Sequence, residues 1–214
     1  MREMLFIVFG YLCGSILFAK ILPQRFCHVD VTKAGKDHNP GTFNAFAAAG
    51  PLMGMLVLGL ELAKGFVPVY LGLSCLTPVH PAAALVLIAP VAGHAWPLFH
   101  FREGGKAIAV SFGVLLGMLP DWRPVLILAC FYLVFSLVLV IRPHMYRSVL
   151  TFLCFAVSCM KLAITPALRF GCMGISLIVC WKHLKTGERE ALSVEVPIVR
   201  GRKQRNHEEK EWKV

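Results

Sequence analysis

The sequence predicts an all-α, polytopic membrane protein with about seven transmembrane helices. Hydrophobic residues make up 57% of the 214 residues and charged residues only 16%, whereas soluble domains average about 45–50% and about 25%. Apolar stretches recur between clusters of Pro, Gly and charge. A bilayer core about 30 Å thick needs about 20 mostly apolar residues per helical crossing. The composition therefore excludes an ordinary cytosolic globule.

Each predicted crossing is an apolar run bounded by turn-forming or charged residues. The first has no A-x-A-like cleavage site and is interpreted as a retained span, not a removed signal peptide. The second follows the turn NPGTFN, the third begins after HP, and the fourth opens at the Lys of GGK. The fifth follows DWRP, the sixth RPHMYR and the seventh TPALR. The ranges are 3–22, 45–73, 81–98, 106–119, 124–141, 148–164 and 168–182.

The distribution of basic residues predicts the orientation. Most of the 22 Lys and Arg residues fall in residues 20–44, 99–106 and 142–147 and in the C-terminal tail. Because cytoplasmic loops are enriched in Lys and Arg, the N-terminus is expected outside and the C-terminus in the cytosol. We expect a multi-pass protein of the cell inner (plasma) membrane. It comprises one domain over residues 1–190 and a charged cytoplasmic tail over residues 191–214, which is expected to be poorly ordered.

The formal net charge of +10 would suggest a nucleic-acid partner in a soluble protein. Here many of the basic residues lie in the tail, which favours contact with anionic lipid headgroups, and no nucleic-acid partner is expected. The eight cysteines include no CxxC pair and lie mostly in apolar runs. Neither a disulfide framework nor a metal site is predicted.

Two polar, glycine-bearing segments on the predicted cytoplasmic side could bind phosphate. Residues 39–44 form a Pro-Gly turn before the second span, where the N–H groups of a helix start can hold an anion. Residues 104–106, Gly-Gly-Lys, place accessible backbone and an ammonium group at the next helix start. The alternatives are a plain loop with an N-cap for the first and a positive-inside anchor for the second.

A third segment, residues 181–188, ends the last span with a basic helix end closed by Gly187, which could also be only a C-cap. Inside the second span, Glu61 and Lys64 lie three residues apart and can share a helix face. Ionised groups at this depth are functional candidates, although an ion pair that only fixes helix packing is the alternative. His28, His80 and His144 lie near span ends and receive no role.

The absence of known catalytic motifs narrows the chemistry. The sequence has no GxSxG elbow and no HExxH, so Ser-His hydrolysis and zinc proteolysis are poorly supported. It also lacks HxxxxD, the acid-base pair of the common CoA-dependent glycerolipid acyltransferases. His183 and Glu188 have that spacing with the wrong acid.

Five short motifs, in order, resemble the PlsY family of integral-membrane acyl-phosphate:glycerol-3-phosphate acyltransferases. They are GYLCGSI, NPGTFN, ELAKGF, GHAWP and GGK, and the resemblance covers about residues 5–190. The family patterns read like GSGN-x-G-x-TN, then GHxFP followed by GGKG, then HxxNxxRxxxGxE. The residues that match them are Asn39, Gly41, Asn44, His94, Pro97, Gly104, Gly105, Lys106 and Gly187.

The chain also departs from these patterns. Asp37 and His38 stand where the family has Ser-Gly, and Ala107 follows GGK. With Gly187 as the anchor of the last pattern, the positions of its His, Asn and Arg fall on Leu177, Cys180 and His183. On this alignment the phosphate-binding segments are retained and the third motif is mostly lost.

The resemblance implies transfer of an acyl chain from acyl phosphate to glycerol 3-phosphate, which gives lysophosphatidate and phosphate in phospholipid synthesis. The expected partners are these two substrates and membrane lipids, with no cofactor. Gly104, Gly105, Lys106 and the turn over residues 39–44, including Thr42, would bind the two phosphates. His94 would orient a substrate or accept a proton, and Asp37 could orient the glycerol backbone.

Two alternatives remain at this point. The loss of the third motif would suit a catalytically inactive lipid-binding or assembly member of the same fold. The intramembrane Glu61 and Lys64 would suit a small anion transporter, although the sequence shows no inverted repeat.

Overall fold

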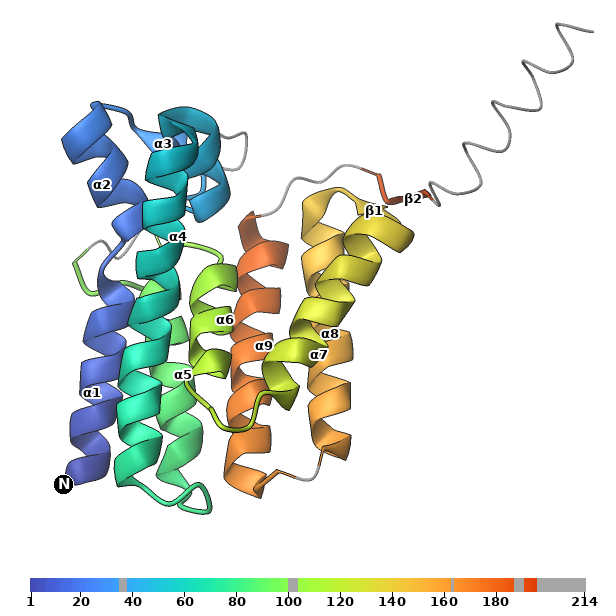
Figure 1. Ribbon diagram of the computed structural model, residues 1–214. Coiled ribbons are helices and arrows are strands. Elements are labelled where there is room, and N and C mark those ends of the chain that lie inside the picture. Colours follow the sequence, from blue (N-terminus) through green and yellow to red (C-terminus); the bar gives the residue numbers. More distant parts are fainter. Residues whose placement is uncertain (35–37, 100–103, 163, 187–190, 196–214) are drawn as a thin grey trace, which may run out of the picture.

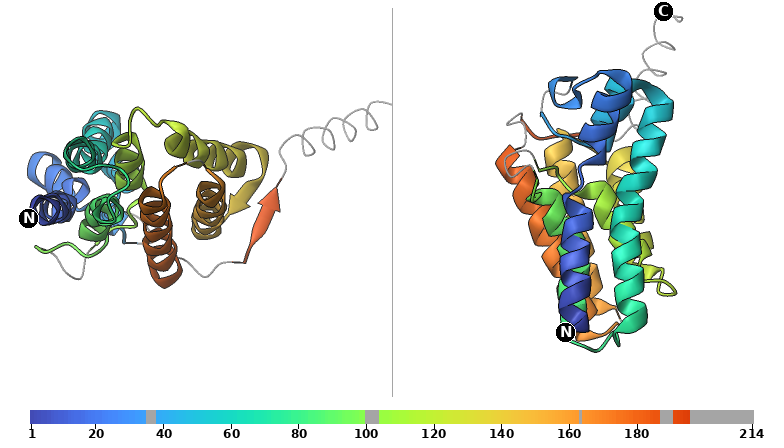
Figure 2. Two further views of the ribbon diagram at one scale, coloured as in Figure 1. Left: turned by 90° about the horizontal axis from the view of Figure 1, so that it is seen from below. Right: turned by 90° about the vertical axis from the view of Figure 1, so that its left-hand side faces the viewer.

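A bundle of helices forms the molecule, and a short two-stranded sheet lies at one end of it (Figure 1). The computed structural model describes residues 1–34, 38–99, 104–162, 164–186 and 191–195. Seen along the bundle, the helices of the first half of the chain gather on one side and α7, α8 and α9 on the other (Figure 2). Each of the seven predicted apolar ranges overlaps a helix of the bundle.

The first predicted span is divided into two helices. α1 (Arg2–Ser15) ends at Ile16, which is extended, and Leu17 is also non-helical with φ of −89° and ψ of 77°; α2 (Phe18–Cys27) then begins. The short α3 (Val31–Ala34) follows. α2 and α3 lie at the end of the bundle opposite the N-terminus (Figure 1). The sequence gives no sign of this break, because residues 3–22 contain no proline.

The longest helix, α4 (Thr42–Cys75), is kinked at Gly50. Gly50 has φ of 84°, which glycine adopts without the steric cost of a Cβ. Pro51 follows it and brings no N–H to the helical hydrogen-bond ladder. The kink separates a first turn near the cavity described below from the long part that spans the bundle.

The remaining elements complete the bundle in chain order. α7 continues directly into a short π-helix, η1, and α8 begins after the strand β1. The elements are α5 (Ala82–Ala95), α6 (Ile108–Leu116), α7 (Arg123–Leu133), η1 (Val134–Val138), β1 (Val140–Arg142), α8 (His144–Lys161), α9 (Pro166–Thr186) and β2 (Ser193–Glu195).

The strand β2 pairs antiparallel with β1, with Ile141 opposite Val194. The segment after α9 thus returns to the start of α8. Residues 193–195, beyond the proposed domain boundary at residue 190, therefore pair with a strand that lies between α7 and α8, and the boundary itself stays a prediction.

Helices pack closely where glycine allows it. A Cβ on Gly14 of α1 would collide with the backbone of Pro90 in α5, and a Cβ on Gly113 of α6 would collide with the carbonyl of Leu62 in α4. Small residues let membrane helices approach to backbone contact in this way. These contacts join α1 to α5 and α4 to α6. The candidate site lies between α4, α5 and α6.

The outer surface of the bundle is apolar, as a bilayer requires. Large side chains such as Leu52, Leu126 and Phe170 are exposed on it. Within the described ranges, three helical stretches are long and apolar enough to cross a bilayer: Arg2–Cys27, Thr42–Cys75 and Pro166–Thr186. Ala82–Ala95 and Arg123–Val138 are shorter apolar stretches. The chain is therefore described as a mostly helical membrane protein, while seven crossings and their orientation stay predictions.

The contact at Gly113 yields a test of the packing. Gly113→Ala should lower the unfolding midpoint in detergent, because overpacking a tight contact costs about 1–3 kcal/mol. The control is Gly59→Ala in α4, where a Cβ meets no atom within 4 Å. Gly59→Ala should leave the midpoint unchanged or raise it, since Ala favours helix more than Gly. Equal midpoints for the two variants would contradict this packing.

Candidate active site

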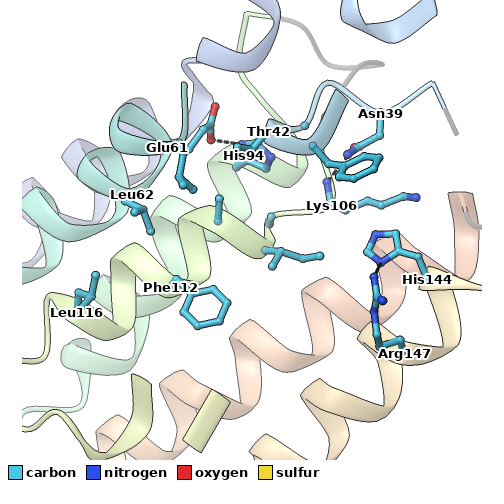
Figure 3. Close-up of a pocket in the computed structure, with 16 residues that line it drawn as sticks. Asn39, Thr42, Glu61, Leu62, His94, Lys106, Phe112, Leu116, His144 and Arg147 are labelled. Carbon is cyan, nitrogen blue, oxygen red and sulfur yellow. Dashed lines mark hydrogen bonds and ion pairs between the residues drawn. The ribbon is translucent and has the colours of Figure 1, made fainter. Parts of the chain in front are cut away.

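A cavity of about 620 Å³ opens between α4, α5, α6 and the start of α8 (Figure 3). One part of its wall carries polar and charged side chains, and the rest is apolar. The residues that line it are Asn39, Gly41, Thr42, Phe43, Leu58, Glu61, Leu62, His94, Lys106, Ala107, Ile108, Ala109, Phe112, Leu116, His144 and Arg147.

A buried ion pair from α4 stabilises the break between α1 and α2. The Lys64 Nζ lies 2.8 Å from the Glu61 Oε2, and each side chain is only 2% exposed. Lys64 Nζ also donates a hydrogen bond to the carbonyl of Ile16 at 2.6 Å. The N–H of Ala19 donates to Glu61 Oε1 at 3.3 Å. The pair thus satisfies a carbonyl and an N–H at the break, which explains how an uncapped helix end is tolerated inside the bundle.

The same ion pair holds His94, which lies in the last turn of α5. His94 Nδ1 is 3.2 Å from Glu61 Oε2 and 2.9 Å from Lys64 Nζ. His94 is buried and lines the cavity together with Glu61. Glu61 and Lys64 therefore join the helices and also hold His94 at the cavity wall.

The Gly-Gly-Lys segment lies against the end of α5. The N–H of Gly105 donates to the carbonyl of His94 at 3.1 Å. A Cβ on Gly104 would collide with the carbonyl of Ala95, and a Cβ on Gly105 would collide with His94 Nε2. These positions therefore require glycine. Lys106 follows, with its side chain on the cavity wall (Figure 3).

The start of α6 adds backbone donors to the same wall. Ala107, at the N-cap, has a left-handed conformation with φ of 61° and ends the loop. Ile108 and Ala109, the first residues of α6, also line the cavity. The first N–H groups of a helix have no partner within the helix and attract anions.

The 39–44 turn is joined to the Gly-Gly-Lys segment through Asn39. The N–H of Lys106 donates to Asn39 Oδ1 at 3.2 Å, and Asn44 Nδ2 donates to the carbonyl of Asn39 at 2.8 Å. Gly41 packs on the Asn39 amide, where a Cβ would collide. Thr42 begins α4, and its buried Oγ1 has no hydrogen-bond partner among the described residues. Two segments that are far apart in sequence thus form one wall, as the sequence analysis expects.

The predicted site residues reach this region to different extents. Asn39, Gly41, Thr42, Glu61, His94 and Lys106 line the cavity. Behind the wall, Asn44, Gly105 and Lys64 contact residues that line it, and Gly104 packs against Ala95 at the end of α5. Asp37, Gly187 and Glu188 lie outside the described residues.

His183 is fully buried near the cavity without lining it. Its Nδ1 lies 2.8 Å from the carbonyl of Val179. Its ring packs edge-on against the ring of His144, with the ring centroids 5.5 Å apart. The neighbouring Lys182 is also buried and donates to the carbonyl of Ala95 at 3.0 Å. The end of α9 is therefore linked to both walls of the site.

His144 and Arg147 form a wall of the cavity that the sequence analysis missed. They lie three residues apart at the start of α8, with Arg147 Nη2 3.4 Å from His144 Nδ1 (Figure 3). Their only signal in the sequence is a basic cluster after the fifth apolar run, which the positive-inside rule already explains. Their position shows that these basic groups also belong to the cavity.

The cavity is cationic at its polar end and apolar beyond it. Lys106 and Arg147 contribute positive charge, and the Glu61 carboxylate is paired with Lys64. Leu58, Leu62, Phe112 and Leu116 form the apolar part. Such a cavity suits a ligand with an anionic head and an apolar chain.

The fold and this cavity define a helical membrane protein with a buried site for an amphiphilic anion. The sequence profile of the glycerol-3-phosphate acyltransferase family matches residues 4–191. The chain belongs to this family. The resemblance noted from the five motifs is thereby confirmed.

Individual relatives show the same relationship. The glycerol-3-phosphate acyltransferase of Latilactobacillus sakei is 38% identical over 120 residues, which are 56% of this chain and 58% of the relative. That of Lacticaseibacillus casei is 35% identical over 62% of this chain and 61% of the relative. That of Streptococcus thermophilus is 31% identical over 79% of this chain and 76% of the relative. The chain thus spans about three fifths of the length of the first two relatives.

Two solved structures share the fold. The glycerol 3-phosphate form of PlsY (YgiH), an integral membrane glycerol 3-phosphate acyltransferase, matches with a TM-score of 0.76 at 24% identity, covering 86% of this chain and 90% of that one. Its lysophosphatidic acid form matches with a TM-score of 0.74 at 22% identity, covering 86% and 89%. At this identity the likeness supports the fold alone.

The contact between Gly105 and His94 can be tested by ligand stabilisation. Inorganic phosphate should raise the unfolding midpoint of the wild-type protein in detergent, because a ligand that binds only the folded state stabilises it. Gly105→Ala should abolish this rise, since the added Cβ displaces the His94 ring. The control Gly59→Ala should keep it. An undiminished rise in Gly105→Ala would show that this wall does not bind the anion.

Proposed function

We propose that the protein transfers an acyl chain from acyl phosphate to glycerol 3-phosphate, giving lysophosphatidate and inorganic phosphate for phospholipid synthesis. The observation that carries the proposal is the cavity, in which a polar wall formed by the 39–44 turn and the Gly-Gly-Lys segment faces Arg147 of α8 and continues into an apolar part along α6. Membership of the acyltransferase family supports it. Both substrates carry a phosphate, and one also carries an acyl chain.

The proposed reaction needs positioning more than a protein nucleophile. The glycerol hydroxyl oxygen forms a bond to the acyl carbonyl carbon, the bond from that carbon to the phosphate oxygen breaks, and the hydroxyl proton ends on the released phosphate, which leaves as hydrogen phosphate. Because the mixed anhydride is already activated, the site must stabilise charge on the leaving phosphate and hold the hydroxyl about 3 Å from the carbonyl. Water must be kept out.

The described residues suggest two phosphate positions. One lies at Lys106 and the start of α6, where the Asn39 turn and the Thr42 hydroxyl complete the wall. The other lies at Arg147 and His144 on the facing wall. Arg suits a phosphate because its guanidinium can donate two parallel hydrogen bonds. Two cationic walls would place the two substrates on opposite sides of the reacting carbonyl.

The acyl chain would lie along α6. Ile108, Phe112 and Leu116 follow at helical spacing on the cavity wall. From Ile108 to Leu116 the helical rise covers about 12 Å. Longer acyl chains must therefore continue past Leu116 toward the bilayer.

The third motif fits the structure better in a different alignment from the one anchored on Gly187. That alignment places the family His at Leu177, which is 67% exposed on the surface of the bundle. Placing the family His on His183, beside the cavity residue His144, puts Thr186 at the Asn position and Arg189 at the Arg position. On this alignment His183, Arg189 and Glu195 match the pattern while Thr186 and Ser193 do not, so three of its five positions are retained. This weakens the main reason for an inactive member of the fold.

The transporter alternative also loses its main support. It was motivated by intramembrane charges at Glu61 and Lys64. Both charges contact each other and the broken backbone between α1 and α2. They are therefore explained by the architecture without a moving ion.

We further propose seven crossings of the inner (plasma) membrane, with the N-terminus outside and the cavity at the cytosolic side. α2, α3, β1 and β2 lie at the end of the bundle away from the N-terminus (Figure 1). This end carries Lys20, Arg25, Lys33, Arg142 and Arg147. Their concentration supports a cytosolic position.

The acyltransferase proposal is tested by a product assay with purified protein, acyl phosphate and glycerol 3-phosphate. Lys106→Ala should lower turnover about 10²–10³-fold, because it removes a preorganised cation from the leaving phosphate. The matched control is Lys161→Ala, which removes an exposed lysine at the far end of α8 and should leave turnover unchanged. Absence of lysophosphatidate with the wild-type protein, or wild-type turnover in Lys106→Ala, would refute the proposal.

The placement of the acyl chain makes a separate prediction. Leu116→Trp should shift the preference toward shorter acyl phosphates, because the larger side chain narrows the apolar end of the cavity. Leu177→Trp makes the same substitution at an exposed position of α9 and serves as the control. The measurement is kcat/KM for a series of acyl phosphates. An identical chain-length profile for both variants would contradict the channel along α6.

A further inference from the structure

We propose that Lys64 is a positioning residue that holds His94 in the tautomer with the proton on Nε2, so that His94 donates a hydrogen bond to the bound phosphate. The tautomer follows from the geometry alone, and its use toward phosphate depends on the proposed function. This assigns His94 a role as a donor, where the sequence analysis considered it as an orienting group or a proton acceptor.

The number of protons on Lys64 determines whether His94 Nδ1 carries one. A lysine ammonium has three N–H donors and no acceptor. Three acceptors surround Lys64 Nζ: the Ile16 carbonyl at 2.6 Å, Glu61 Oε2 at 2.8 Å and His94 Nδ1 at 2.9 Å. One proton for each acceptor satisfies all three, and this requires an unprotonated His94 Nδ1.

The competing arrangement has a proton on Nδ1 that is donated to Glu61. That contact is longer, at 3.2 Å, and the same Glu61 oxygen is already ion-paired with Lys64 at 2.8 Å. A proton on Nδ1 would also face the ammonium 2.9 Å away, leaving one Lys64 proton without an acceptor in this cluster. A doubly protonated ring would place a second positive charge beside Lys64. The neutral ring with Nε2–H avoids both conflicts.

The Nε2 atom of His94 lies at the Gly-Gly-Lys segment. It packs against Gly105, where even a Cβ would collide with it. Gly105 belongs to the segment that ends at Lys106, and both His94 and Lys106 line the cavity. The Nε2–H group therefore lies at the polar wall, beside the start of α6. There it adds a neutral donor to the lysine charge and the helix N–H groups.

The three acceptors around Nζ also explain why a lysine lies at this depth. An ammonium in the bundle interior is costly, and the Ile16 carbonyl alone could be satisfied by a neutral donor. A neutral donor with two protons, such as a glutamine amide, would not serve the three acceptors together. The lysine is suited to link the broken helix, the carboxylate and the imidazole.

The direct test is nitrogen NMR of the full-length protein with 15N-labelled histidine in nanodiscs. The ring nitrogens of the two tautomers have different chemical shifts, and His94→Gln identifies the His94 signals by their loss. The expected result is a neutral ring protonated at Nε2. A proton on Nδ1 in the wild-type protein would overturn the proposal, whether or not the protein shows acyltransferase activity.

Lys64→Met removes the donor and is expected to move the proton to Nδ1, where Glu61 Oε2 is the remaining partner. A His94 ring that keeps Nε2–H in this variant would show that Lys64 does not set the tautomer. A purely structural role of Lys64 would not change the ring nitrogens.

If Lys64→Met does not fold, kinetics of His94 variants test the donor role. Glutamine keeps an N–H donor near the Nε2 position but is no base, whereas alanine has neither. We expect His94→Gln to retain turnover within about tenfold of wild type and His94→Ala to lose about 10²-fold or more, mainly in kcat. Equal losses in the two variants would overturn the donor role, while lysophosphatidate formation by the wild-type protein tests the proposed function separately.

Discussion

The rest of the site depends on the buried pair of Glu61 and Lys64. An unpaired backbone group in the interior of a membrane bundle costs several kcal/mol. The break after α1 exposes such groups, and Lys64 and Glu61 each satisfy one of them. The same two side chains hold His94 at the cavity. One cluster therefore stabilises both the break between the first helices and the position of His94. A substitution in this cluster would alter both.

The second constraint is the way distant loops share one wall. Asn39 bonds to the backbone of Lys106, and Gly105 bonds to the end of α5. These contacts bring the start of α4 to the start of α6 through the short side chain of Asn39. Part of the wall is formed by backbone, and backbone donors need little reorganisation when charge develops on a ligand. The apolar side of α6 continues directly from this wall. The head of a bound ligand would therefore lie in polar surroundings and its chain in apolar ones.

Much of the architecture could be predicted from local sequence, because apolar runs, turn residues and glycine-rich segments act over short distances. The break at Ile16 and Leu17 could not be predicted, since its partners lie some 45 residues further along, in α4. His144 receives no role from the sequence and Arg147 counts only toward the orientation, because a basic cluster beside an apolar run fits both an anchor and a binding site. Burial supports the alignment of the third segment on His183, which lies beside His144, over that on the exposed Leu177. The sequence also carries a signal for it, since His183 and Arg189 have the spacing of the family His and Arg.

The central claim is that one cavity holds a phosphate head at its cationic wall and an acyl chain along α6. A structure of the protein with a non-transferable acyl phosphonate would test it most directly. We expect the phosphonate to lie beside Lys106 and the start of α6, and the acyl chain to pass Phe112 toward Leu116. A phosphonate bound away from Lys106, or a chain that leaves the bundle without contacting α6, would contradict it.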